Sequence, residues 1–201
     1  MRNMAHPNMF MVILLVLLAW LPNSGASASR NKNINYVRDA CTVTRYRDLC
    51  IHSLAPFSST ARRSPSKWAR AGVSVTIGEV KSVTLFLFKL KKRARMRGRN
   101  RVALSDCIEC FQSTIDELHR SLGILRKLSA RDFDTQMADL TTFMSAALTD
   151  EDTCLDGFGG QTGRQVNLLK KRILKTTYLT SNALALVNKL ATTGLESIPD
   201  P

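Results

Sequence analysis

The chain has 201 residues and carries 29 basic against 16 acidic residues, a formal net charge of +13. Its hydrophobic content of 44% excludes collagen-like and disordered chains and is enough for one domain with its own core. The basic excess favours an acidic partner, which can be a polyanion, an anionic surface or an acidic protein. Nucleic acid is not expected as that partner, because the few aromatic residues do not alternate with the bases and because the start of the chain indicates export.

The first 28 residues have the pattern of a secretory signal peptide. Residues 10–21 form an apolar run, Pro22 interrupts it, and Ala26 and Ala28 provide a small-residue cleavage site. The alternative is an uncleaved N-terminal anchor, but the run is shorter than the ~20 residues that span a bilayer, and no later segment is expected to qualify. We predict a signal peptide at 1–28 and a secreted single domain at 29–201 without a membrane span. Since the leader contains Arg2 and no acid, the mature chain keeps a net charge of +12.

The first part of the mature chain combines a cysteine-containing unit with a segment of uncertain type. Residues 34–57 surround Cys41 and Cys50, and a stretch rich in Pro, Ser and Arg up to Pro65 is typical of a linker. Residues 68–92 fit a helix, although the alternation of β-branched residues at 73–77 is also typical of a strand. A lone strand would have no partner elsewhere in the chain, so we predict a helix.

Three later segments carry one apolar stripe each at the helical period of three and four residues. The stripes consist of Leu104, Ile108, Phe111, Ile115, Leu118, Leu122 and Leu125; of Phe133, Met137, Leu140, Met144, Ala147 and Cys154; and of Val166, Leu169, Ile173, Thr176, Ala183, Val187 and Leu190. Thr180 and Asn182 interrupt the third stripe, and we expect a polar contact or a water there. Four amphipathic segments joined by short loops predict an all-α fold, an up-down-up-down four-helix bundle over about 65–192.

The five cysteines indicate covalent links between these segments. A bond between Cys41 and Cys50 would close a small loop, and one between Cys107 and Cys154 would join two neighbouring helices at a shared end. Cys110 lies one turn from Cys107 and could compete for Cys154. We predict the pair Cys107–Cys154 with Cys110 free. A zinc site is disfavoured because the chain has no pair of CxxC motifs and no supporting histidine pair.

No pattern in the chain predicts catalysis, a metal site or a cofactor. His119 follows Asp116 by three residues on a helix, a spacing that can orient an imidazole for general base chemistry. However, His119 projects away from the apolar stripe, and the chain has no nucleophile elbow and no glycine-rich phosphate loop. We therefore expect a surface histidine and no enzyme.

Four motifs in order resemble the plant invertase and pectin methylesterase inhibitor family. Residues 41–50 (CTVTRYRDLC) resemble its N-terminal hairpin, in which two cysteines flank a Thr-x-Tyr core, and residues 103–109 (ALSDCIE) resemble its Ala-Leu-x-Asp-Cys motif. Residues 145–149 (SAALT) with 153–158 (TCLDGF), and 179–187 (LTSNALALV), are similar to its third and closing helices. The chain departs from the family pattern at Arg47, where Pro is frequent, and at Phe143-Met144, where Trp is favoured.

The resemblance implies a four-helix bundle with an N-terminal helical hairpin (about 34–57), two disulfides, and an apoplastic protein that inhibits a plant cell-wall enzyme by covering its active-site cleft. The closing helix is more similar to the pectin methylesterase branch, and the Pro-Lys-Phe element associated with invertase inhibition is absent. The alternatives are an inhibitor of acid invertase, a basic cell-wall-binding protein without an enzyme target, and a pro-region of a larger enzyme. The last is disfavoured because no catalytic domain follows the bundle.

Two surfaces are candidates for partner binding. In the pectin methylesterase branch the bundle helices supply the contacts, which makes the outward face of the third helix, with Thr141, Thr142, Ser145 and Thr149, our predicted interface; the alternative is an ordinary solvated face. A basic run between the first two bundle helices could hold acidic pectin or steer the protein to an acidic enzyme surface; alternatively, it is a solvated loop. That run contains Lys91, Lys92, Arg93, Arg95, Arg97 and Arg99.

Overall fold

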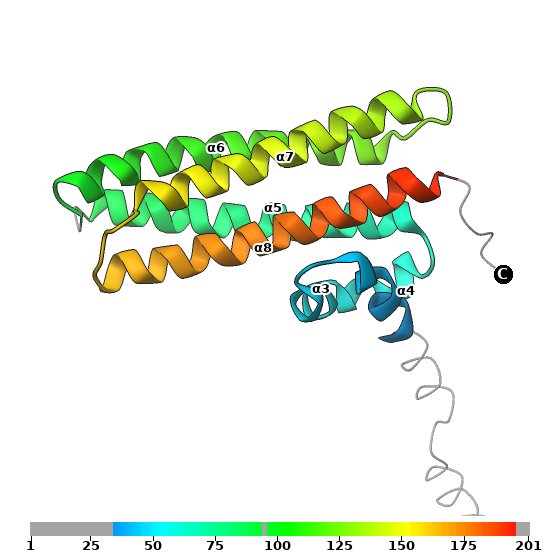
Figure 1. Ribbon diagram of the computed structural model, residues 1–201, viewed down its shortest axis with the longest axis horizontal. Coiled ribbons are helices and arrows are strands. Elements are labelled where there is room, and N and C mark those ends of the chain that lie inside the picture. The colour runs from blue at the N-terminus through cyan, green and yellow to red at the C-terminus, as the bar shows by residue number, and fades with distance from the viewer. Residues whose placement is uncertain (1–33, 94–95, 196–201) are drawn as a thin grey trace, which may run out of the picture. The chain divides into compact units, whose positions relative to one another are not determined.

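The computed structural model describes residues 34–93 and 96–195. Four long helices form the body of the molecule: α5 (Pro65–Lys92), α6 (Arg99–Arg126), α7 (Phe133–Gly157) and α8 (Arg164–Thr193). The pairs in contact are α5 with α6, α6 with α7, α7 with α8 and α8 with α5, so the four helices close into a ring. Consecutive helices run in opposite directions (Figure 1). The all-α up-down-up-down bundle is therefore confirmed, whereas the predicted signal peptide at 1–28 lies outside the described residues.

The predicted stripes form the core of this bundle. Each of α6, α7 and α8 turns its stripe inward, and almost all members are buried, with Ile115 and Phe133 half-buried at the edge. The largest enclosed side chains come from all four helices: Leu87 of α5; Phe111, Leu118 and Leu125 of α6; Leu140 and Met144 of α7; and Leu169, Ile173 and Leu190 of α8. Burial of such side chains stabilises the fold by roughly 1.5–3 kcal/mol each relative to exposure.

Helix α5 resolves the ambiguity of the 73–77 segment in favour of a helix. It begins at Pro65, because Ser64 caps it: the Ser64 hydroxyl accepts a hydrogen bond from the Lys67 amide at 3.4 Å, and Pro at the first position needs no partner. Gly72 faces α8 so closely that a Cβ there would lie 3.3 Å from the Ala183 Cα atom. The β-branched residues at 73 and 77 are buried in the bundle rather than paired in a sheet.

The apolar character of α5 also corrects one prediction. Within the described ranges α5 is the one helix long and apolar enough to cross a membrane, judged by length and composition alone. The expectation that no segment after the leader would qualify is therefore wrong by that criterion. Half of its most apolar stretch is buried inside the protein, and Val73, Val80 and Val83 have no exposed surface. These buried residues supply the bundle core.

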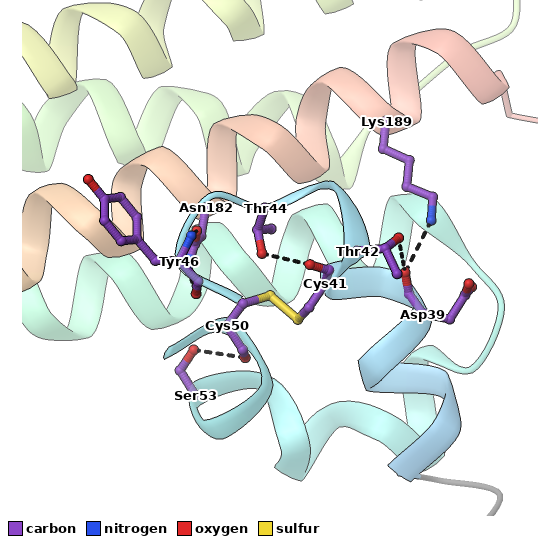
Figure 2. The surroundings of a disulfide bond; sticks show 9 residues. All are labelled: Asp39, Cys41, Thr42, Thr44, Tyr46, Cys50, Ser53, Asn182 and Lys189. Atoms are coloured by element: carbon purple, nitrogen blue, oxygen red, sulfur yellow. Dashed lines mark hydrogen bonds between the residues drawn. A yellow bond between two sulfur atoms is a disulfide. The ribbon is translucent and has the colours of Figure 1, made fainter. Parts of the chain in front are cut away.

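The N-terminal hairpin contains residues 34–40 in helical conformation, η1 (Cys41–Val43) and α3 (Arg47–Leu54). The Cys41–Cys50 disulfide joins its two arms across a Cα–Cα distance of 5.8 Å (Figure 2). The stretch expected as a linker is largely helical, since η2 (Ala55–Phe57) and α4 (Ser58–Ala61) follow α3 directly. The Ser58 hydroxyl stabilises this turn by donating to the Ala55 carbonyl at 2.8 Å.

One side chain of α8 connects the hairpin to the bundle. The Asn182 amide accepts a hydrogen bond from the Tyr46 N–H at 3.1 Å and donates one to the Tyr46 carbonyl at 2.9 Å. Beside it the Tyr46 ring stacks on Tyr178 with 3.9 Å between centroids. Asn182 is one of the two residues that interrupt the α8 stripe, and the polar contact expected there is confirmed.

The second disulfide joins α6 to α7 through Cys107 and Cys154, both buried, with Cα atoms 4.4 Å apart. The prediction of two disulfides is confirmed, and Cys110 is unpaired.

Replacing Cys107 and Cys154 together by Ala should lower the free energy of unfolding by about 4 kcal/mol, and replacing Cys41 and Cys50 by about 3 kcal/mol, because the first pair closes the longer loop. Guanidinium unfolding of the oxidised proteins measures both. Peptide mapping that finds Cys110 joined to Cys154 would contradict the assignment.

Asn182→Ala should lower the free energy of unfolding by about 1–3 kcal/mol, because it leaves the Tyr46 N–H without a partner at a half-buried position. The Tyr46 carbonyl loses one hydrogen bond and keeps the one from the Cys50 N–H at 2.9 Å. Urea unfolding measures the loss, and hydrogen exchange at the Tyr46 amide should accelerate. The control is Asn188→Ala, an exposed position two turns later on α8, where we expect a change below about 0.5 kcal/mol. Equal effects of the two substitutions would show that the Asn182 hydrogen bonds do not hold the hairpin.

Candidate partner-binding surface

The outward face of α7 presents a row of short side chains. Thr142, Ser145 and Thr149 are exposed and Thr141 is half-buried, whereas the opposite side of α7 packs into the bundle. Thr153 continues the row one turn after Thr149 and was missed, although its spacing of four residues from Thr149 was visible in the sequence. We call the row formed by 142, 145, 149 and 153 the α7 row.

The three threonine hydroxyls of the row are used within the helix. Thr142 donates to the carbonyl of Ala138 at 3.0 Å, Thr149 to Ser145 at 3.0 Å, and Thr153 to Thr149 at 2.8 Å. These bonds hold the three threonine side chains against the helix backbone. When a partner packs on the α7 row, these side chains therefore lose little conformational entropy. Long flexible side chains in the same place would have to become ordered, and this ordering would weaken binding.

Acidic residues surround the α7 row. Helix α7 contains six acids and no base: Asp134, Asp139, Asp150, Glu151, Asp152 and Asp156. Partial burial, reinforced by the charge of Glu117 on α6, raises the pKa of Asp150. The negative potential of this face favours a partner with a neutral or basic contact surface.

Glu151 lies behind the row, on the core side of α7. Its side chain has no exposed surface, and its Oε1 atom accepts a hydrogen bond from the Thr180 hydroxyl of α8 at 2.7 Å. Its Oε2 atom has no hydrogen-bond partner in the described part of the chain. Burial raises the pKa of Glu151 from 4.5 to about 8, even though the Thr180 hydrogen bond favours the charged form. The carboxyl group is therefore protonated at neutral and acidic pH.

The predicted stripe already contained the position of Glu151. It lies four residues after Ala147 and three before Cys154, so the helical period places it inside. The residue type argued against a core position for 151, because Glu is almost never fully buried without a partner. The partner is Thr180, the other residue that interrupts the α8 stripe.

The basic run lies at the opposite end of the bundle from the hairpin. Lys91 and Lys92 belong to the last turn of α5 and Arg99 to the first turn of α6, so a shorter connection than expected, residues 93–98, joins the helices. Arg93 and Arg97 are exposed, and Arg95 lies outside the described residues. Met96 is buried and, with Leu90 and Leu104, lines a cavity that also contacts Lys91, Arg97 and Arg101. The connection is therefore held on the bundle by an apolar contact.

Comparison with known proteins decides the family. The model of the family described as plant invertase/pectin methylesterase inhibitor matches residues 35–186. Pectinesterase inhibitor 6 of Arabidopsis thaliana is 46% identical over 87% of this chain and 86% of its own length, and pectinesterase inhibitor 9 of the same plant is 32% identical over 92% and 94%. The chain belongs to the plant invertase/pectin methylesterase inhibitor family. A crystal structure of a mutant form of a pectin methylesterase inhibitor from Arabidopsis aligns with a TM-score of 0.60 at 19% identity, over 74% of this chain and 92% of that chain, which supports the fold.

The match to this inhibitor family includes the α7 row, Glu151, Asn182 and all five cysteines. His119 is exposed on α6, the position expected for a surface histidine. In the described part of the chain no group of three His, Cys, Asp or Glu side chains is placed to hold a metal ion. Burial, followed by the charge of Asp150, raises the pKa of the Cys110 thiol, which disfavours the nucleophilic thiolate form.

Glu151→Gln should flatten the pH dependence of stability. The pKa of Glu151 is raised in the folded state, so stability is fully present below about pH 4.5 and is lost as the pH rises towards about 8, with a slope of up to about 1.4 kcal/mol per pH unit. Gln stays neutral throughout, and the variant should therefore exceed the wild type in stability at pH 8. Urea unfolding between pH 5 and 8 measures the slopes. Glu109→Gln, at an exposed position on α6, should keep the wild-type slope, and a Glu151→Gln profile parallel to the wild type would refute the assignment.

Proposed function

We propose that this protein is a secreted inhibitor of plant pectin methylesterase. It binds the enzyme in a stoichiometric complex, covers the active-site cleft and so limits pectin de-esterification in the cell wall. The observation that carries the proposal is the 46% identity to an Arabidopsis pectinesterase inhibitor over 86% of that protein's length. The signal peptide predicted at 1–28 supports an extracellular, apoplastic location.

The α7 row is our proposed contact surface for the enzyme. A convex helix face fits a concave cleft, and Ser145 and Thr149 offer short side chains that allow close backbone approach. The threonine side chains held against the helix and the Cys107–Cys154 bond behind the row favour binding because little of the inhibitor must become ordered in the complex. Inhibition then needs no chemistry from the inhibitor, since an occupied cleft excludes the substrate.

A direct titration tests the target. Purified oxidised protein is added to plant pectin methylesterase and, separately, to acid invertase, and each activity is followed to stoichiometric excess. We expect loss of pectin methylesterase activity with an end point at one inhibitor per enzyme and no effect on invertase. Loss of invertase activity alone would assign the protein to the other branch of the family, and loss of neither would leave a wall-binding protein without an enzyme target.

The surface is tested by Ser145→Arg, which places a long charged side chain in the middle of the α7 row. We expect the inhibition constant for pectin methylesterase to rise at least about tenfold, equivalent to about 1.4 kcal/mol, because the larger side chain prevents close contact. Ser82→Arg is the matched control: it makes the same change at an exposed position of α5, the helix at the opposite corner of the bundle, and should leave the constant within about twofold. A similar effect of both substitutions would exclude the α7 row as the contact surface.

A further inference from the structure

Basic and acidic residues are distributed unequally among the four long helices. Helix α5 has six bases and one acid, and α8 has six bases and no acid, whereas α6 is balanced and α7 carries six acids and no base. The two basic helices are neighbours, and α7 lies at the corner opposite α5. The net positive charge of the chain is therefore concentrated on one side of the bundle, which the short basic run at 91–99 did not reveal.

Two contacts fix how α5 and α8 lie beside each other. The Lys175 ammonium pairs with Glu79 at 2.8 Å, and the Arg172 guanidinium lies over the Phe86 ring, 4.6 Å from its centroid. Because the helices are antiparallel, the last two turns of α5 lie beside the first two turns of α8. This end of the seam is remote from the hairpin, which contacts α8 near Asn182 and Lys189 (Figure 2).

Exposed apolar side chains lie among the bases at this end. Leu85 is 62% and Leu168 42% exposed, and Leu168 lies one turn before Arg172 on the same side of α8. We define the seam surface by the exposed bases Lys89 and Lys92 of α5 and Arg164 and Lys171 of α8, together with Leu85 and Leu168. In the described ranges these four bases have no ion-pair partner. On each helix the bases and the apolar side chain lie within about 10 Å of one another along the axis.

We propose that the seam surface binds a linear polyuronate, the de-esterified form of pectin. A polyuronate combines carboxylates, which the bases attract, with sugar rings whose C–H faces pack on Leu85 and Leu168. An extended surface in which the two kinds of side chain alternate suits such a chain better than it suits a membrane, which requires a continuous apolar face. The choice of this polymer rests on the proposed function, because pectin methylesterase produces carboxylates on pectin.

Binding on this side would leave the enzyme-facing surface accessible. The five acids of α7 other than the buried Glu151 repel a polyanion, so the polymer is held on the α5–α8 side while the α7 row remains open. The inhibitor would then be concentrated on the polymer that its target modifies, which raises the effective concentration of the two proteins for each other. The exposed Arg93 and Arg97 continue the same positive surface around the end of the bundle.

The test compares two variants of the full mature chain with equal net charge. The seam variant combines Lys89→Gln, Lys92→Gln, Arg164→Gln and Lys171→Gln. The control combines Arg47→Gln, Lys67→Gln, Arg126→Gln and Lys127→Gln, which are exposed bases at the hairpin end of the bundle. Binding to polygalacturonate, to fully methyl-esterified pectin and to phosphatidylglycerol vesicles is measured at 50 and 200 mM NaCl, and circular dichroism melting verifies folding.

We expect the wild type to bind polygalacturonate, to bind methyl-esterified pectin at least about tenfold more weakly, and to lose affinity at the higher salt. The seam variant should lose at least about tenfold in affinity and the control less than about threefold, because surface charges act mainly near the ligand. The uncharged pair Leu85→Ser and Leu168→Ser should weaken binding severalfold without changing its salt dependence. Equal losses in the two charge variants, or binding to vesicles without binding to polygalacturonate, would overturn the proposal.

The enzyme titration separates this proposal from the proposed function. Polygalacturonate binding without inhibition of pectin methylesterase would support the seam surface and contradict the inhibitor assignment. Inhibition by a protein that does not bind polygalacturonate would contradict the seam surface alone. If the seam variant still inhibits the enzyme on a small soluble ester substrate, the two surfaces act separately, as proposed; loss of that inhibition would show that the seam itself is part of the enzyme contact and would overturn the separation.

Discussion

The fold depends on the way α8 satisfies two polar residues inside the bundle. Thr180 and Asn182 lie where apolar side chains would otherwise continue the core, and both are buried. A buried polar group without a partner costs about 1–3 kcal/mol. The Thr180 hydroxyl can also bond the Thr176 carbonyl of its own helix at 3.1 Å, but it is the partner of the buried Glu151 of α7, and Asn182 bonds the backbone of Tyr46 in the hairpin. The last helix of the chain thereby fixes the positions of both an earlier helix and the N-terminal hairpin.

These two contacts also keep the molecule's surfaces apart. Glu151 is neutral when protonated, so α7 can be buried on one side without an unpaired charge and still present acids on the other. Helices α5 and α8 hold most of the bases of the bundle, and Glu79 with Lys175 is the ion pair between them. The result is a bundle with an acidic helix at one corner and a basic seam away from it. A single rigid domain can in this way carry the two surfaces proposed above without one interfering with the other.

Much of this architecture could be predicted from the sequence, because helical stripes report burial directly. Leu104 to Leu125 forms one such stripe, and its residues are core residues in the structure. The pairing of Cys107 with Cys154 followed from the same stripes. Three features could not be predicted in this way: the helical segment at 55–61, the contact of Thr180 with the buried Glu151, and the pairing of α5 with α8 that brings their bases together. The first depends on tertiary contacts such as the Trp68 indole N–H donating to the Arg62 carbonyl at 2.7 Å, and the others depend on which helices become neighbours.

The end of α7 shows why the candidate surface is built on the bundle and not on a loop. Cys154 is bonded to α6, and Glu151, one turn earlier, is bonded to Thr180 of α8. Thr149 and Thr153 lie on the outer side of the same two turns, so the proposed contact surface is held from behind by a covalent bond on one side and a buried hydrogen bond on the other. A helix fixed at both flanks cannot rotate to adapt to a cleft. Any affinity of the proposed surface for an enzyme must then come from complementarity that exists before binding, and such complementarity favours selectivity between related partners.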